Sequence, residues 1–191
     1  RLVSSLGQGL ADGELLQLSN VSNHSFSETV YFDVIRKKTA ALFAACTEAA
    51  AYSVGVSEEE VKLARLLGEY IGICFQIKDD IFDYFDSKEI GKPTGNDMLE
   101  GKLTLPVLYA LNRANDNQAA EIALKVKEGT ATLAEIARLI AFTKENGGIE
   151  YAVRTMNAYK QKAFGLLASL PDSAICVALR SYLDYVVALE K

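Results

Sequence analysis

Three aspartates stand close together in an apolar part of the sequence, and their spacing suits a metal ion. Asp79, Asp80 and Asp83 form the pattern D-D-x-x-D within residues 75–83, where Phe and Ile flank them. On a helix, Asp79 and Asp83 project from nearly the same face, and Asp80 lies about 100° further round. Like charges in apolar surroundings need a compensating cation, and magnesium prefers carboxylate and phosphate oxygens. The motif therefore predicts a magnesium–diphosphate site, with an exposed acidic helix face as the alternative.

A glycine-rich stretch that carries lysines follows the acidic motif. Residues 87–106 include Lys92 and Lys102 together with three glycines. Glycine lets the backbone approach an anion closely, and a lysine ammonium neutralises phosphate charge. The alternative is an ordinary connection between two helices, since the P-loop pattern is absent and no strand precedes the stretch. Its place directly after the aspartates favours phosphate binding.

A second basic position lies upstream, between two apolar segments. Lys37 and Lys38 are followed there by Thr39. By itself, such a lysine pair is typical of a helix end, where the charges interact with the helix dipole. The lysine pair alone therefore does not indicate a binding site.

The elements that carry these residues are predicted to be helices. Apolar residues recur at three- and four-residue spacing through nearly the whole sequence, which indicates an all-α fold. Ser57 with Glu60, and Thr132 with Glu135, match capping boxes at two helix starts. Short connections predict antiparallel neighbours in a bundle. Helices are expected near residues 1–19, 27–38, 39–55, 58–87, 104–113, 118–128, 132–145, 148–169 and 173–189.

The segment that carries the aspartates is expected to be the central helix. Residues 58–87 are apolar around most of the helix circumference, which is typical of a buried helix. Gly68 and Gly72 share one face of it. Because glycine lowers helix propensity, this pair indicates that another helix or a ligand presses close at that face.

Composition excludes several classes of protein. The chain has 191 residues, of which half are hydrophobic, and a net charge of −5, so no basic field for nucleic acid or an anionic membrane surface is present. No stretch is long and apolar enough for stable membrane insertion. Cys46, Cys74 and Cys176 form no metal-binding pattern with the single His24. We interpret these cysteines as reduced, buried thiols of a protein located in the cytoplasm.

Taken in order, five stretches resemble the polyprenyl synthetase family, which comprises the trans-type isoprenyl diphosphate synthases. They are GELLQ at residues 13–17, KTAALF at 38–43, FQIKDDIFD at 75–83, GKPTGND at 91–97 and GKLTLP at 101–106. The resemblance runs from about residue 9 to residue 112 and includes the family's second aspartate-rich motif. It implies that residues 1–191 are the C-terminal part of a single helical domain of the isoprenoid synthase type.

The resemblance implies a role for each charged position of the motifs. Asp79, and with it Asp80 and Asp83, would help bind a magnesium ion that bridges an allylic diphosphate. Lys38 and Lys92 would grip that diphosphate. Lys102 occupies a matching motif position and is assigned to diphosphate binding as well.

Two uncharged residues complete the implied site, and the reaction follows from the family. Thr39 and Gln76 would face the allylic carbon and stabilise the developing cation through their oxygen dipoles. The implied reaction is ionisation of the allylic C–O bond, attack by the double bond of isopentenyl diphosphate, and loss of a proton. A homodimer is expected from the same resemblance.

Two other functions stay open at this point. One is a terpene cyclase-like enzyme of the same fold, and the other is a non-catalytic partner subunit of a heteromeric prenyl diphosphate synthase. The Lys38–Thr39 pair and the Gly91–Lys92 loop favour elongation over cyclisation. The intact F-Q-x-x-D-D-x-x-D pattern weighs against a non-catalytic subunit.

The sequence also departs from the family. These enzymes use two facing aspartate-rich motifs, and the first of them is absent from the 191 residues. We therefore expect the chain to be a fragment whose other half lies upstream of Arg1, and to be inactive on its own.

Overall fold

The computed structural model describes residues 2–21, 25–85, 94–170 and 173–189, and all regular structure in these ranges is helical. The prediction of an all-α fold is confirmed. No helix within these ranges has the length and apolar character needed to cross a membrane. The helices are α1 (Leu2–Val21), α2 (Glu28–Ile35), η1 (Arg36–Ala40), α3 (Ala41–Ser53), α4 (Glu58–Phe82), α5 (Asn96–Leu99), α6 (Leu105–Ala114), α7 (Asn117–Lys127), α8 (Leu133–Glu145), α9 (Gly148–Ala168) and α10 (Ala174–Val187).

Three details differ from the sequence-based expectation. The π-helix η1 joins α2 to α3, where the pattern predicts a boundary between residues 38 and 39. Helix α4 ends at Phe82 and not near residue 87, because the backbone N–H of Tyr84 bonds the carbonyl of Ile81, three residues back, at 3.1 Å. Asp83 therefore lies in a turn. The short helix α5 occupies part of the stretch that was expected to be a loop.

Both predicted capping boxes are present. The Ser57 hydroxyl accepts a hydrogen bond from the backbone N–H of Glu60 at 3.3 Å, and the Glu60 carboxylate accepts from the N–H of Ser57 at 2.9 Å. Thr132 and Glu135 make the same reciprocal pair at the start of α8. These starts were readable from sequence because each box involves residues only three positions apart.

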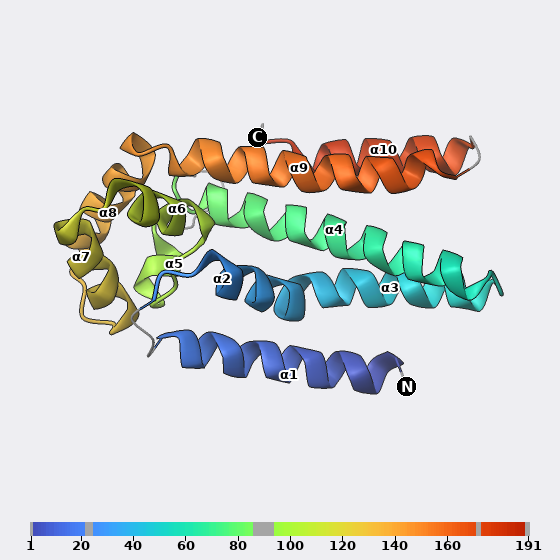
Figure 1. The fold of residues 1–191 in the computed structure, drawn as a ribbon, viewed down its shortest axis with the longest axis horizontal. Helices are drawn as coiled ribbons and strands as arrows, with labels where there is room; N and C mark the ends of the chain where they lie inside the picture. The colour runs from blue at the N-terminus through green and yellow to red at the C-terminus, as the bar shows by residue number, and fades with distance from the viewer. Residues whose placement is uncertain (1, 22–24, 86–93, 171–172, 190–191) are drawn as a thin grey trace. The chain divides into compact units, whose positions relative to one another are not determined.

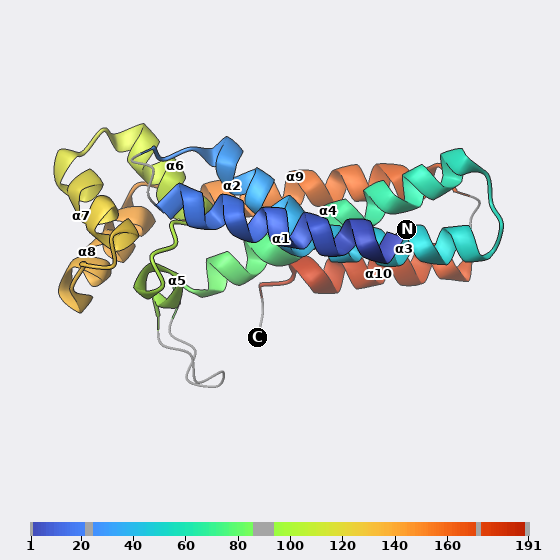
Figure 2. The ribbon, with the colours of Figure 1, turned by 90° about the horizontal axis from the view of Figure 1, so that it is seen from below.

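The chain forms two compact units, and the first comprises Arg1–Glu14, Asp33–Lys78 and Thr155–Lys191. Within it α3, α4, α9 and α10 lie lengthwise beside one another, with α3 antiparallel to α4 and α9 antiparallel to α10 (Figures 1 and 2). The buried cluster joins α4, α9 and α10, which confirms that the helix before the aspartates is central. Its members are Leu67, Ile71, Ala163, Leu167 and Leu183.

The glycine face of α4 packs against the helical segment that contains η1 and α3. A Cβ atom at Gly68 would lie 2.3 Å from Thr47 Oγ1 and 2.5 Å from the Phe43 carbonyl oxygen. At Gly72 it would lie 2.6 Å from the Cα atom of Ala40. A neighbouring helix, not a ligand, therefore explains the two glycines.

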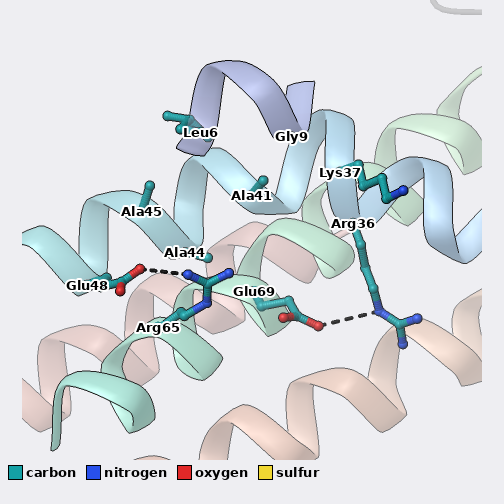
Figure 3. A pocket seen from close by; sticks show the side chains of 10 residues that line it. All are labelled: Leu6, Gly9, Arg36, Lys37, Ala41, Ala44, Ala45, Glu48, Arg65 and Glu69. Atoms are coloured by element: carbon teal, nitrogen blue, oxygen red, sulfur yellow. Dashed lines mark hydrogen bonds and ion pairs between the residues drawn. The ribbon is translucent and has the colours of Figure 1, made fainter. Parts of the chain in front are cut away.

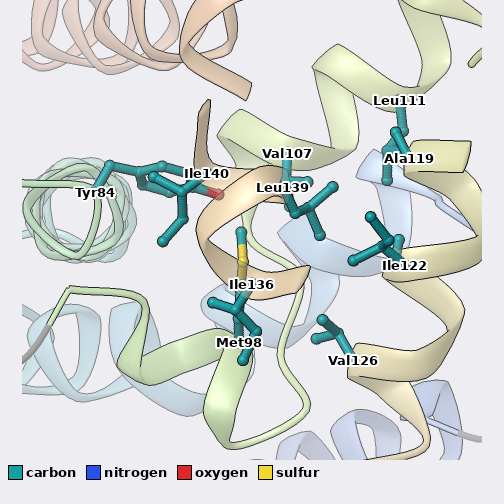
Figure 4. Packing of buried hydrophobic residues seen from close by; sticks show 11 residues of the cluster. Tyr84, Met98, Val107, Leu111, Ala119, Ile122, Val126, Ile136, Leu139 and Ile140 are labelled. Atoms are coloured by element: carbon teal, nitrogen blue, oxygen red, sulfur yellow. The ribbon is translucent and has the colours of Figure 1, made fainter. Parts of the chain in front are cut away.

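The second unit comprises Leu15–Phe32 and Asp79–Arg154. In it α8 packs against both α6 and α7, and α7 also contacts α5. Figure 4 shows the apolar core that these helices share. The buried members are Tyr84, Met98, Val107, Leu111, Ala119, Ile122, Ala123, Val126, Ile136, Leu139 and Ile140. This core therefore supports the turn that follows the aspartate motif.

The Tyr84 hydroxyl is a buried polar group that makes no hydrogen bond of normal geometry among the described residues, although the nearby Thr104 side chain acts to lower its pKa. The side chain is 2% exposed and points into the apolar core beside Ile140 (Figure 4), and burial raises the pKa of its hydroxyl. We expect Tyr84→Phe to raise the free energy of unfolding by about 1 kcal/mol, because it removes an unsatisfied group and keeps the ring. Urea denaturation measures this change.

Tyr151→Phe is the control for that experiment. The Tyr151 hydroxyl donates a hydrogen bond to the Glu28 carboxylate at 2.7 Å, so its removal should lower the free energy of unfolding. If Tyr84→Phe lowered stability as well, the Tyr84 hydroxyl would have to make a stabilising contact.

Candidate active site

The Lys-Thr pair lies on the π-helix η1 in the first unit. A π-helix inserts one extra residue into a helical turn, and such turns are frequent at functional sites. The Thr39 hydroxyl donates a hydrogen bond to Gln76 Oε1 of α4 at 2.7 Å. Two predicted site residues that are far apart in the sequence are thus brought into direct contact.

Lys38 is held by a carboxylate that the sequence analysis did not assign. Its ammonium forms an ion pair with Glu14 of α1 at 2.6 Å. Gly13 makes this approach possible, because a Cβ atom there would lie 2.8 Å from the Cβ atom of Lys37. Both Gly13 and Glu14 belong to the GELLQ stretch, so their motif position was the available signal.

The three aspartates occupy three different environments. Asp79 is exposed on the last turn of α4, Asp80 is only 2% exposed, and Asp83 is half-buried in the following turn. In the parts of the chain that the structure describes, no three or more His, Cys, Asp or Glu side chains are grouped to hold a metal ion. Magnesium commonly binds through one or two carboxylates together with substrate phosphates. A single exposed carboxylate at Asp79 fits that mode of binding.

Asp80 is paired with a tyrosine of α2. The Tyr31 hydroxyl donates a hydrogen bond to Asp80 Oδ2 at 2.5 Å, and this contact is buried. Burial of Tyr31, and then the charge of Asp80, raise the pKa of the Tyr31 hydroxyl well above its ordinary value. The hydroxyl therefore keeps its proton and acts as a donor. No motif pointed to Tyr31 in the sequence.

Asp83 caps the helix that follows it. Its carboxylate oxygens accept hydrogen bonds from the backbone N–H groups of Asn96 at 2.9 Å and Asp97 at 3.2 Å. Its backbone carbonyl accepts from the N–H of Gly95 at 2.8 Å, and Gly95 adopts the left-handed conformation, with φ of 80°, that favours glycine. Asp83 thus satisfies the first N–H groups of α5, which have no partner within the helix.

This capping role leads to a prediction. Asp83→Ala should lower the free energy of unfolding by about 1–2 kcal/mol, because it removes the acceptor for the first N–H groups of α5. Asp83→Asn should cost less, since the amide oxygen still accepts a hydrogen bond. Chemical denaturation of the two variants tests the difference. Equal losses would mean that the negative charge of Asp83, not its capping geometry, is what stabilises the turn.

Lys102 lies among acids just beyond α5. Its backbone N–H donates to the Asp97 carbonyl at 2.8 Å, and its ammonium is paired with the Glu100 carboxylate and lies 4.0 Å from Asp97 Oδ1. Burial and then the charge of Asp83 raise the pKa of Asp97, Lys102 opposes the rise, and the resulting pKa is about 6. Asp97 is a site neighbour that sequence reasoning missed. Lys92, the other predicted diphosphate lysine of this stretch, lies outside the described residues.

A pocket of about 240 Å³ opens beside the π-helix in the first unit (Figure 3). Arg36 Nε lies 3.4 Å from Glu69, and an Arg65 nitrogen lies 2.9 Å from Glu48. Acids and bases on the pocket wall therefore largely neutralise one another. The pocket does not include the Thr39–Gln76 contact. Its lining residues are Leu6, Gly9, Arg36, Lys37, Ala41, Ala44, Ala45, Glu48, Arg65 and Glu69.

Fold and motifs together define an all-α chain of the isoprenoid synthase type, and solved structures agree. Geranylgeranyl pyrophosphate synthase from Bacteroides thetaiotaomicron is 81% identical, with a TM-score of 0.95, over 98% of this chain and 62% of that one. A polyprenyl synthase from Caulobacter crescentus CB15, complexed with calcium and isoprenyl diphosphate, is 33% identical with a TM-score of 0.88. The match covers 97% of this chain and 57% of that one.

The family assignment follows from the sequence comparison. The polyprenyl synthetase model matches residues 1–143, so the chain belongs to the polyprenyl synthetase family. Octaprenyl diphosphate synthase of Haemophilus influenzae is 38% identical over 90% of this chain and 52% of its own length. Heptaprenyl diphosphate synthase component 2 of Geobacillus stearothermophilus is 35% identical over 91% of this chain and 53% of its own length. The chain thus spans about half the length of these curated relatives.

Proposed function

We propose that the protein containing this chain elongates an allylic diphosphate by head-to-tail condensation with isopentenyl diphosphate and releases pyrophosphate. The observation that carries the proposal is the contact between Thr39 and Gln76, at 2.7 Å, in a chain of the polyprenyl synthetase family. It joins the Lys-Thr pair to the helix that bears the aspartate motif. A cation-forming reaction needs both oxygen dipoles and diphosphate binding, and these are the groups that the two motifs supply.

In the proposed reaction, the allylic C–O bond breaks and its electron pair leaves with pyrophosphate. The double bond of isopentenyl diphosphate then forms the new C–C bond, and loss of a proton restores a double bond. Lys38, Lys92 and Lys102 would neutralise the leaving diphosphate. Thr39 and Gln76 would direct their oxygens at the developing positive charge.

Magnesium is the metal of the proposal, and it would supply charge neutralisation at the leaving diphosphate. Asp79 would bind it directly, because its carboxylate is exposed. Asp80 and Asp83 would support that position from the buried side and from the turn. The calcium in the related Caulobacter crescentus structure supports a hard divalent cation that prefers oxygen ligands.

A cytoplasmic location and a homodimer are also part of the proposal. Support for the location comes from Cys46, Cys74 and Cys176, none of which is in a disulfide bond, as expected for a reducing compartment. Cys74 and Cys176 are buried as predicted from the sequence, but Cys46 is exposed, so the prediction of a buried thiol is wrong for Cys46. Burial raises the pKa of Cys74 to about 12, so this thiol is unreactive at neutral pH. Support for the homodimer comes from the family resemblance.

A second candidate is one component of a two-component synthase. The Geobacillus stearothermophilus relative bears the name component 2 of a heptaprenyl diphosphate synthase. In that case the protein would elongate allylic diphosphates only together with a different subunit.

The test is a product assay on the complete translated protein. It is offered farnesyl diphosphate, labelled isopentenyl diphosphate and magnesium, and the extracted lipid is sized. We expect a labelled product of discrete length that requires magnesium. If a folded protein left all label in the aqueous phase, elongation by this protein alone would be refuted. The 191-residue chain, assayed in parallel, is expected to be inactive.

A further inference from the structure

The last turn of α4 is an unfavourable place for acids. Asp79 and Asp80 lie at the C-terminal end of the helix, where the dipole is negative and repels carboxylates. Asp80 is also 2% exposed, and burial of a carboxylate costs free energy unless it accepts hydrogen bonds. The helix nevertheless continues to Phe82. A favourable contact within the second unit is therefore needed to offset the repulsion by the helix dipole and the cost of burying Asp80.

Tyr31 provides that contact from α2. Its side chain is 6% exposed, and its hydroxyl donates to Asp80 Oδ2 at 2.5 Å. The two residues are 49 positions apart in the sequence, so the bond fixes the end of α4 to a distant helix. A hydrogen bond to a buried carboxylate is stronger than a neutral one.

Neighbouring residues on a helix point about 100° apart, so the orientation of Asp80 sets that of Asp79. With Asp80 held inward by Tyr31, the Asp79 carboxylate is exposed. We propose that Tyr31 is a positioning residue of the metal site: its bond to Asp80 keeps the last turn of α4 wound and holds Asp79 where it can take a divalent cation with a diphosphate. This inference rests on the proposed function and deepens it.

The experiment compares Tyr31→Phe with Tyr151→Phe in the complete protein. Tyr151 is a matched control, because its hydroxyl also donates to a carboxylate of α2, that of Glu28, at 2.7 Å. The probe is Mn²⁺ titrated in the presence of pyrophosphate and followed by electron paramagnetic resonance. We expect Tyr31→Phe to weaken Mn²⁺ binding by about 10-fold or more, as loss of a supporting partner of a metal ligand does. Tyr151→Phe should bind Mn²⁺ like the unaltered protein.

Hydrogen exchange supplies a second readout that needs no metal. Amides in the last turn of α4 should exchange faster in Tyr31→Phe than in Tyr151→Phe, because only the first loses the anchor of that turn. Unchanged exchange together with unchanged Mn²⁺ affinity would overturn the role of Tyr31. If the unaltered protein bound no Mn²⁺ with pyrophosphate, the proposed function would fail, and hydrogen exchange would still decide whether Tyr31 anchors the turn.

Asp80→Asn serves if Tyr31→Phe does not fold. The amide oxygen of the new side chain still accepts a hydrogen bond from Tyr31. We expect the amides in the last turn of α4 to exchange in this variant as slowly as in the unaltered protein, because the anchor is kept. Exchange as fast as in a variant without the Tyr31 hydroxyl would mean that the bond to Asp80 does not hold the turn and would refute the positioning role.

Discussion

Asp79→Ala in the complete protein should reduce the rate of product formation by at least about a thousandfold. Asp79 is the one aspartate of the motif whose side chain is exposed, whereas Asp80 is buried and Asp83 is half-buried. Its loss removes the proposed carboxylate ligand of magnesium, and metal stabilisation of a leaving group is worth several kcal/mol. About 4 kcal/mol corresponds to a thousandfold change in rate.

Glu145→Ala is the matched control for this variant. Glu145 is also an exposed acid at the C-terminal end of a helix, α8, in the same unit. Its removal should leave the rate within about twofold, because a surface acid away from the site contributes little. Initial rates with labelled isopentenyl diphosphate measure both variants. A rate for Asp79→Ala close to that of Glu145→Ala would show that Asp79 does not hold the metal.

Gly68→Ala should lower the free energy of unfolding by about 3 kcal/mol or more. The added methyl would overlap Thr47 Oγ1 at 2.3 Å and the Phe43 carbonyl oxygen at 2.5 Å. Backbone atoms of α3 cannot move aside without separating the two helices, so the change overpacks the interface. Urea denaturation gives the stability difference.

Gly165→Ala, in the same unit, should raise the free energy of unfolding instead. Among the described residues, and apart from the adjoining residues and backbone of α9 itself, no atom lies within 4 Å of a Cβ atom built at Gly165. Alanine has the higher helix propensity, so this variant should gain about 0.5–1 kcal/mol. If Gly68→Ala were as stable as Gly165→Ala, the inference that α4 packs too closely on α3 to admit a side chain at Gly68 would be refuted.

Sequence pattern was sufficient for most of the helices. The capping boxes at Ser57 and Thr132 and the apolar repeat of α4 are local signals, and the structure confirms them. The π-helix η1 was not recognised, because one extra residue in a turn shifts the apolar spacing, and such a shift resembles a boundary between two helices, here between residues 38 and 39. Helix α5 has only four residues, Asn96–Leu99, too few for any periodicity.

The different environments of the three motif aspartates could not be predicted from the sequence. Asp79, Asp80 and Asp83 are identical side chains, yet one is exposed, one is bonded to Tyr31 and one caps α5. These differences come from partners that are distant in the sequence, which spacing along one helix cannot identify. The contact between Thr39 and Gln76 was likewise suggested only by the family resemblance. The reading of residues 1–191 as part of a single domain stays a prediction.

Pyrophosphate release tests the proposed elongation most directly. The complete protein is supplied with farnesyl diphosphate and magnesium, with and without isopentenyl diphosphate, and the released pyrophosphate is counted. We predict release only when isopentenyl diphosphate is present, with one pyrophosphate for each isopentenyl unit incorporated. Equal release from farnesyl diphosphate alone would contradict elongation and indicate a cyclase, and no release from the folded protein under either condition would contradict the assignment of catalysis to this protein alone.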